Sequence, residues 1–288
     1  MGTGDQTNEV PAHLHRALGR VALESARDTY RAALLRLAER VPARAVDVRY
    51  GPDERHLLDI YTPRDAGSPA PIMLWVHGGG HVAGGKGGPD DPFEANVGRF
   101  AAANGFIGVC MSYRLAPAHR WPAQGEDVAR AIAWLQREAA GYGGDAGRIV
   151  LMGASAGAVN VATYLQLAGD TPGIVGAVLM SGSYGYLPPD PGSSHFRYFS
   201  EDAEQRSRQL PRAAVEETAV PLLVTCAQYD PDRYHREFVE LLRARLMRDG
   251  TMPRAHVLSG HNHYTQIFHL GTADSRLGDE ILDFARGL

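Results

Sequence analysis

The chain has 288 residues, of which 44% are hydrophobic and 22% are charged, and its formal net charge is −4. This is the composition of an ordinary globular protein with a sizeable core, and it gives no electrostatic reason to expect binding to nucleic acid or to an anionic membrane. No stretch approaches the roughly 18 continuous apolar residues of a membrane span. The polar first residues lack the apolar core of a signal peptide, so we expect a cytoplasmic protein.

The first expected element is helical. Apolar residues recur at helical spacing between positions 11 and 40, which predicts one long helix or two short ones, and Pro42 ends the segment. Eight strands follow, most of them continuous apolar runs typical of strands buried on both faces: 46–50, 57–61, 72–76, 106–111, 149–152, 177–180, 222–226 and 256–258. Helices are expected at 93–104, 128–135 and 277–284, and in a segment carrying Phe238 and Leu241.

Strands that alternate with helices indicate βαβ units and one mostly parallel sheet, so we expect a single catalytic domain over residues 1–288. Residues 185–219 differ, because they are rich in proline, serine and charge and are too long for an ordinary connection. We interpret them as an insertion over one end of the sheet. The two cysteines, Cys110 and Cys226, lie in apolar runs and suggest no disulfide framework.

The pentapeptide Gly-Ala-Ser-Ala-Gly at 153–157 stands between an expected strand and an alanine-rich helical stretch. A serine at such a tight turn needs small neighbours, and the turn lifts its hydroxyl clear of the sheet at a helix N-terminus. The context therefore predicts that Ser155 is a nucleophile.

A serine nucleophile needs a general base and an acid that orients the base. Asp230 comes just past the end of the strand 222–226 and is the preferred acid, whereas Asp232 is expected to cap the following helix. The base lies after the last strand, where His261 and His263 compete. These two histidines could also form a metal pair, but no third ligand stands at zinc-like spacing in the sequence, so we expect no metal.

Donors for an oxyanion are expected from two places, the amide of Ala156 and the glycine loop 77–80. The loop formally resembles two nucleotide-binding motifs. A dinucleotide fingerprint is disfavoured because no helix opens after it, and a phosphate loop is disfavoured because Gly87 replaces the Ser or Thr that binds Mg²⁺. We expect no cofactor.

Several separate motifs follow one another along the chain: His-Gly-Gly-Gly at 77–80, Ser-Tyr-Arg-Leu-Ala-Pro at 112–117, Trp-Pro-Ala at 121–123, Glu-Asp-Val at 126–128 and the serine pentapeptide. In this order they resemble the hormone-sensitive-lipase-like branch of the α/β-hydrolase carboxylesterases, over about residues 46–284. Tyr-Gly-Pro-Asp at 50–53, Leu-Asp-Ile-Tyr at 58–61 and His-Asn-His-Tyr at 261–264 look more like small bacterial carboxylesterases and kynurenine formamidase-like hydrolases.

The resemblance implies an α/β-hydrolase fold with an eight-stranded, mostly parallel sheet flanked by helices and a small helical cap, formed by residues 11–40 and 185–219. It implies a catalytic triad of Ser155, Asp230 and His263, and an oxyanion hole of Gly79, Gly80 and Ala156. Because the base of this family commonly precedes an aromatic or apolar residue, Tyr264 favours His263 over His261. Ala154 departs from the acidic residue common before the serine, and Ala158 departs from a usual second glycine.

The activity implied is that of a serine carboxylesterase acting on short-chain or small esters through an acyl-enzyme. An amidase of the aryl formamidase type would use the same triad, and a non-catalytic binding protein on this fold is the alternative from another class. A small-molecule ester is the expected partner, and a homodimer is compatible with the sequence.

Overall fold

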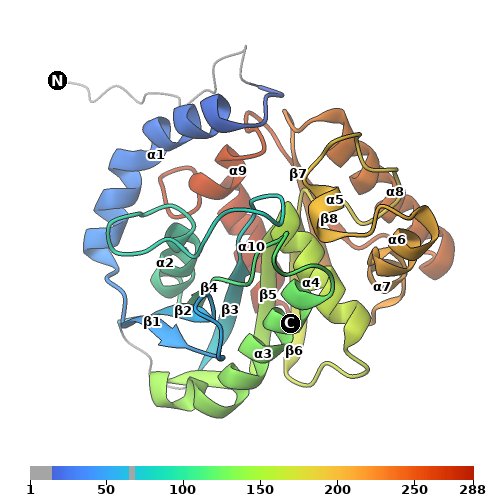
Figure 1. Ribbon diagram of the computed structural model, residues 1–288. Coiled ribbons are helices and arrows are strands. Elements are labelled where there is room, and N and C mark those ends of the chain that lie inside the picture. Colours follow the sequence, from blue (N-terminus) through green and yellow to red (C-terminus); the bar gives the residue numbers. More distant parts are fainter. Residues whose placement is uncertain (1–14, 65–68) are drawn as a thin grey trace.

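We describe a computed structural model of the protein, which covers residues 15–64 and 69–288. Its strands form one eight-stranded sheet in the order β1-β2-β4-β3-β5-β6-β7-β8 (Figure 1). The pairs β1–β2 and β2–β4 are antiparallel and all the others are parallel, which confirms the expected mostly parallel sheet. The strands are β1 Ala45–Arg49, β2 Leu57–Tyr61, β3 Ala70–Val76, β4 Ile107–Met111, β5 Gly144–Ala154, β6 Ile174–Met180, β7 Leu222–Ala227 and β8 Arg254–Leu258.

The helices connect these strands and cover the sheet. They are α1 Arg20–Arg40, α2 Ala95–Ala103, α3 Ala123–Glu138, α4 Ala156–Leu167, α5 His195–Tyr198, α6 Ala203–Gln209, α7 Arg212–Glu217, α8 Asp232–Asp249, α9 Thr265–Phe268 and α10 Arg276–Arg286, with a 3-10 turn at Ala139–Tyr142. The helix expected at 11–40 begins only at Arg20, and residues 11–14 of that expectation lie outside the described part of the chain.

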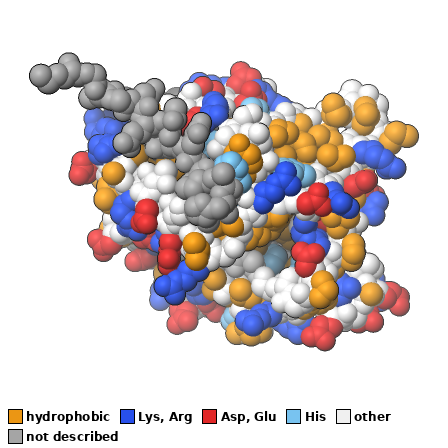
Figure 2. All heavy atoms as spheres, turned by 90° about the horizontal axis from the view of Figure 1, so that it is seen from above, with side chains coloured by type: hydrophobic (Ala, Val, Ile, Leu, Met, Phe, Trp, Pro, Cys, Tyr) orange, Lys and Arg blue, Asp and Glu red, His pale blue; other side chains and the backbone are white. Residues whose placement is uncertain are grey.

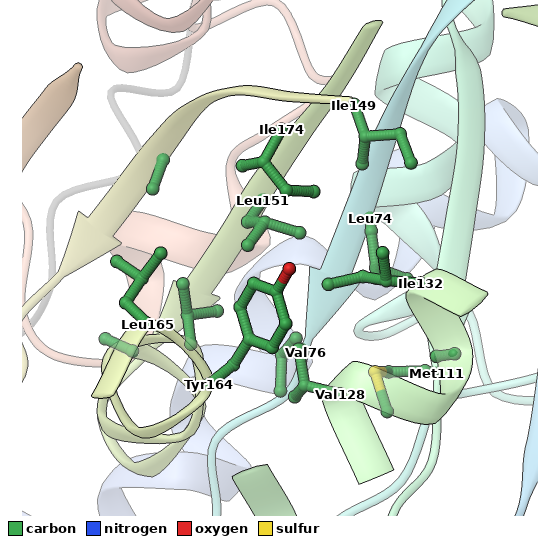
Figure 3. Close-up of a cluster of buried hydrophobic side chains, with 14 of the residues drawn as sticks. Leu74, Val76, Met111, Val128, Ile132, Ile149, Leu151, Tyr164, Leu165 and Ile174 are labelled. Carbon is green, nitrogen blue, oxygen red and sulfur yellow. The ribbon is translucent and has the colours of Figure 1, made fainter. Parts of the chain in front are cut away.

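Successive side chains of each central strand point to opposite faces of the sheet, and both faces are buried. In β3, Leu74 and Val76 belong to a buried cluster that includes residues of α3, α4, α7 and α8, whereas Met73 and Trp75 belong to one that includes residues of α1, α2, α9 and α10. Figure 3 shows part of the first cluster, where Val128 and Ile132 of α3 and Tyr164 of α4 meet strand residues. Continuous apolar runs in the sequence therefore identified these strands correctly.

The segment 185–219 does not contribute to the sheet but folds into α5, α6 and α7. These helices lie at the side of the molecule away from α1 (Figure 1). Glu237 of α8 anchors the start of this segment, because its fully buried carboxylate accepts hydrogen bonds from four consecutive backbone N–H groups, those of residues 184–187, at 2.9 to 3.3 Å.

Among the residues that the structure describes, no helix combines the length and apolar character needed to cross a lipid bilayer. Figure 2 shows positively and negatively charged side chains interspersed on the face that it presents.

Candidate active site

Ser155 stands at the turn between β5 and α4, with φ 54° and ψ −121°. Positive φ is strained for a residue with a side chain, and such strain persists only where the surroundings enforce it. Here the enforcement comes from close packing. A Cβ atom on Gly157 would lie 2.0 Å from the carbonyl oxygen of Val76, so the start of α4 can sit against the end of β3 only because Gly157 has no side chain.

Asp230 follows β7, as the sequence predicts, and is fully buried. Its Oδ1 pairs with Nδ1 of His263 at 2.7 Å. Its Oδ2 accepts hydrogen bonds from the Ser181 hydroxyl at 2.6 Å and from the backbone N–H of Ala227 at 2.7 Å. Because both oxygens are fixed, the carboxylate presents one defined edge to the imidazole.

His263 and Ser155 line the same cavity, whose volume is about 610 Å³. No hydrogen bond joins the two side chains within the described residues. Catalytic hydrogen bonds are often long before substrate binds, so the geometry of the free protein does not exclude a base in this position. The ring of Tyr234, from α8, lies 4.4 Å from the His263 ring and lines the cavity as well. Burial raises the pKa of Tyr234, whereas a hydrogen bond with Ser155 acts to lower it.

The competing residues of the sequence analysis lie elsewhere. His261 is buried and its Nε2 is 2.9 Å from Oδ2 of Asp274, so it is not paired with Asp230. Asp232 is the first residue of α8 and pairs with Arg236 at 2.7 Å. The expectation that Asp232 caps this helix is wrong, because Pro231 holds the capping position and no side-chain cap is formed.

The glycine loop after β3 faces Ser155. Gly79 has φ 117°, and a Cβ atom there would lie 2.1 Å from the carbonyl oxygen of Ala83, so glycine is required. The loop rests on His77, whose Nδ1 donates to the carbonyl oxygen of Gly78 at 2.6 Å. Burial lowers the pKa of His77 to about 3, so this support is an uncharged imidazole. The N–H groups of Gly79 and Gly80 donate to no other described backbone carbonyl.

A second, smaller cavity of about 220 Å³ also reaches Ser155 and is bordered by Gly80, Ala156 and Val159. Its outer wall comes from the segment 185–219 and from α8, through Ser194, His195 and Arg233 among others. Burial lowers the pKa of His195 to about 3. Leu18, which precedes α1, borders both cavities. Ser155 therefore borders two cavities.

Sequence reasoning missed several residues of the site. Ser181 directly follows β6 and has φ 47°, and it bridges Asp230 to Nε2 of Gln266, which donates to its hydroxyl at 2.7 Å. Its position at the end of a parallel strand is the signal that could have identified it. Tyr234 and Glu94 were also missed, because neither belongs to a recognisable motif.

The structure places one of the two competing histidines, His261, beside other possible metal ligands, and His263 does not belong to this group. Donor atoms of His261, His269 and Asp274 all lie within 4.8 Å of one another. Arg276 donates to Asp274 Oδ1 at 2.8 Å and lies 3.0 Å from His261 Nε2, so a positive charge already balances this carboxylate. Hydrogen bonding by Arg276 is the main cause that holds the pKa of Asp274 below its usual value. Asp230 is not a member of this cluster.

Comparisons with known proteins bear on this arrangement. Residues 58–173 match the family model BD-FAE; they include the glycine loop and Ser155 but not Asp230 or His263. Esterase LipC of Mycobacterium tuberculosis is 39% identical over 111 residues, which are 38% of this chain and 27% of that protein. Esterase LipQ of the same organism is 36% identical over 138 residues, which are 47% of this chain and 32% of that protein. The chain thus spans less than about a third of these two relatives.

Solved structures are similar over nearly the whole chain. A hyperthermophilic esterase from the archaeon Pyrobaculum calidifontis has a TM-score of 0.69 and 24% identity, and the alignment covers 93% of this chain and 92% of that one. The esterase Est22 has a TM-score of 0.72 and 22% identity, with 100% and 94% covered. At these identities the likeness concerns the fold.

Proposed function

Because the chain has the α/β-hydrolase fold and resembles carboxylesterases, as its motifs predict, we propose that it is a serine carboxylesterase that hydrolyses small esters through an acyl-enzyme. The observation that carries the proposal is the strained Ser155 turn opening onto the same cavity as the His263–Asp230 pair. The whole-chain activity rests on this site, since the aligned relatives are much longer proteins.

In the proposed mechanism the Ser155 hydroxyl attacks the ester carbonyl carbon while His263 takes its proton at Nε2. The charge that develops on the carbonyl oxygen is stabilised by the N–H groups of Gly79, Gly80 and Ala156, which are preorganised donors. Asp230 holds the Nδ1–H of His263, fixes the tautomer and stabilises the imidazolium. His263 then gives its proton to the leaving alcohol.

Deacylation repeats these steps with water as the nucleophile. His263 takes a proton from the water, the hydroxide adds to the acyl carbon, and Ser155 leaves with the proton returned by His263. The helix α4 begins at Ala156, so its N-terminus adds a favourable field at the oxyanion.

The segments 11–40 and 185–219 act as the cap in this proposal. Their support is the placement of Leu18 and His195 on the cavity walls, beside Ser155. A cytoplasmic location and a homodimer, both considered from the sequence, stay predictions.

The test is a panel of p-nitrophenyl esters of increasing acyl length, assayed with the unaltered protein and with Ser155→Ala. We expect turnover of short esters and a loss on the order of 10⁶ in kcat for the variant. N-formylkynurenine is assayed beside the esters. Cleavage of this amide without any ester turnover would contradict the ester assignment, and a folded Ser155→Ala protein with more than a few per cent of activity would contradict the mechanism.

A further inference from the structure

The larger cavity has one wall that the hydrolytic mechanism does not use. Glu94 lines this wall, in the same cavity as Ser155 and His263. One of its carboxylate oxygens, Oε2, accepts a hydrogen bond from the indole N–H of Trp75 at 2.8 Å. The other, Oε1, has no hydrogen-bond partner among the described residues and is not enclosed by protein, so it is free to meet a ligand in the cavity.

The backbone of Glu94 is strained. Glu94 has φ 64°, the left-handed region that side chains rarely adopt, at the position that precedes α2. Strained residues of this kind cluster at ligand-binding positions, where the surrounding structure enforces them. The observed strain is therefore consistent with a residue that is placed for binding.

The charges that line the cavity leave Glu94 without a direct ion pair among the described residues, although Arg27 also acts on it at longer range. Arg27 and Asp91 line the same cavity, and they form an ion pair with each other at 3.3 Å. Apart from His263, the other described lining residues carry no further ionisable charge, so Glu94 is the carboxylate of this cavity that has no ion pair of its own among the described residues. Aromatic rings of Tyr264 and Phe268 also line it, and such rings attract cations.

We propose that Glu94 forms a subsite for a positively charged ammonium group, so that the enzyme prefers esters carrying an amine in the part that fills the larger cavity. This inference rests on the proposed function for its kinetic consequence, but the subsite itself is a property of the cavity. Burial raises the pKa of Glu94 to about 7, with opposing contributions from Trp75 and Arg27. A cation bound beside Glu94 stabilises the charged carboxylate and therefore lowers its pKa.

The kinetic test compares two acetates of nearly the same shape, the choline ester and the uncharged 3,3-dimethylbutyl ester, by proton release. The ratio of their kcat/KM values is measured for the unaltered protein and for Glu94→Gln, which keeps an oxygen for Trp75. We expect Glu94→Gln to lower the ratio by about fivefold, the effect of one partly exposed charge pair, while turnover of the neutral ester is retained. Asp90→Asn is the matched control, because it removes a negative charge from the same loop outside the cavity lining.

Binding of both esters to Ser155→Ala, with and without Glu94→Gln, tests the subsite without turnover. A preference for the choline ester that Glu94→Gln removes supports the proposal even if the protein hydrolyses neither ester, in which case the proposed function fails alone. Equal ratios in the unaltered protein and Glu94→Gln, or an equal decrease in Asp90→Asn, would overturn it.

Discussion

Glu237 provides the sharpest prediction about how the cavity wall is held. Its side chain is fully buried, and its two oxygens accept from the N–H groups of residues 184–187 and from the Ser183 hydroxyl at 3.2 Å. In Glu237→Gln an NH₂ group replaces one acceptor oxygen. With the NH₂ group at the Oε1 position, the N–H of Leu187 and the Ser183 hydroxyl lose their acceptor. With the NH₂ group at the Oε2 position, the N–H groups of residues 184–186 lose theirs, so at least two donors lose their partner.

Hydrogen bonds to charged groups are worth about 1.5–3 kcal/mol each, so the loss of two predicts a decrease of about 4 kcal/mol in the free energy of unfolding. For a chain of this size that corresponds to a decrease of roughly 10 °C in Tm. Urea unfolding and a thermal melt measure both. Glu240→Gln is the control, because this residue lies on the same helix with its side chain 43% exposed, and we expect a change within about 0.5 kcal/mol. A decrease below about 1 kcal/mol for Glu237→Gln would refute the reasoning.

The remaining predictions concern the base, the substrate and pH. His263→Ala should remove nearly all esterase activity, whereas His261→Ala should leave a substantial fraction in initial-rate assays, because His261 pairs with Asp274 and not with Asp230; reversed phenotypes would exchange their roles. Rates on p-nitrophenyl esters should fall with acyl length, since one of the two cavities beside Ser155 is only about 220 Å³. We also expect no activation at an oil–water interface, and a rate that rises steadily to C12 or C16 esters would contradict this prediction. Urea unfolding should show lower stability at pH 5 than at pH 7. Burial lowers the pKa to about 3 in three histidines, which are His77, His195 and His269. As the pH falls below about 6.5, only the unfolded chain protonates these imidazoles, so each lowers the free energy of unfolding by about 1.4 kcal/mol per pH unit. Glu94, with its pKa raised to about 7, has the opposite sign and offsets one of them; equal or greater stability at pH 5 would contradict the assignment of neutral buried imidazoles.

The sequence predicted the sheet well because strands buried on both faces must be apolar at every position. The run at 149–152 marked the centre of β5, although the strand extends over Gly144–Ala154. Its N-terminal part carries no apolar signal, because Asp145 there is partly exposed and Arg148 is exposed. The sequence therefore predicts the centres of strands better than their ends.

The candidate site was predictable where short motifs set the backbone. The small residues around Ser155 are needed for its turn, and the strand ends indicated where Asp230 and His263 should lie. The partners of Asp230 were not predictable, because Ser181 and Gln266 are ordinary polar residues that only the fold brings together. Ranking Asp232 as a helix cap failed because Pro231 can begin a helix without a side-chain cap.

Glu94 and the cluster around His261 show the same limit. Arg27, Asp91 and Glu94 meet only because α1 lies beside α2, far from it in sequence. His261 and Asp274 meet across α9. The charge balance of a cavity depends on such contacts, so no spacing along the chain indicates which carboxylate has no ion pair in the folded protein.

The most direct test of the central claim identifies the nucleophile covalently. Diethyl p-nitrophenyl phosphate transfers its diethylphosphoryl group to an activated serine and releases p-nitrophenol, and peptide mass spectrometry then locates the adduct. The account predicts one adduct per chain, on the peptide containing Ser155, with parallel loss of ester hydrolysis and no labelling of Ser155→Ala. An adduct on another residue, or an active protein that the reagent leaves unlabelled and uninhibited, would contradict it.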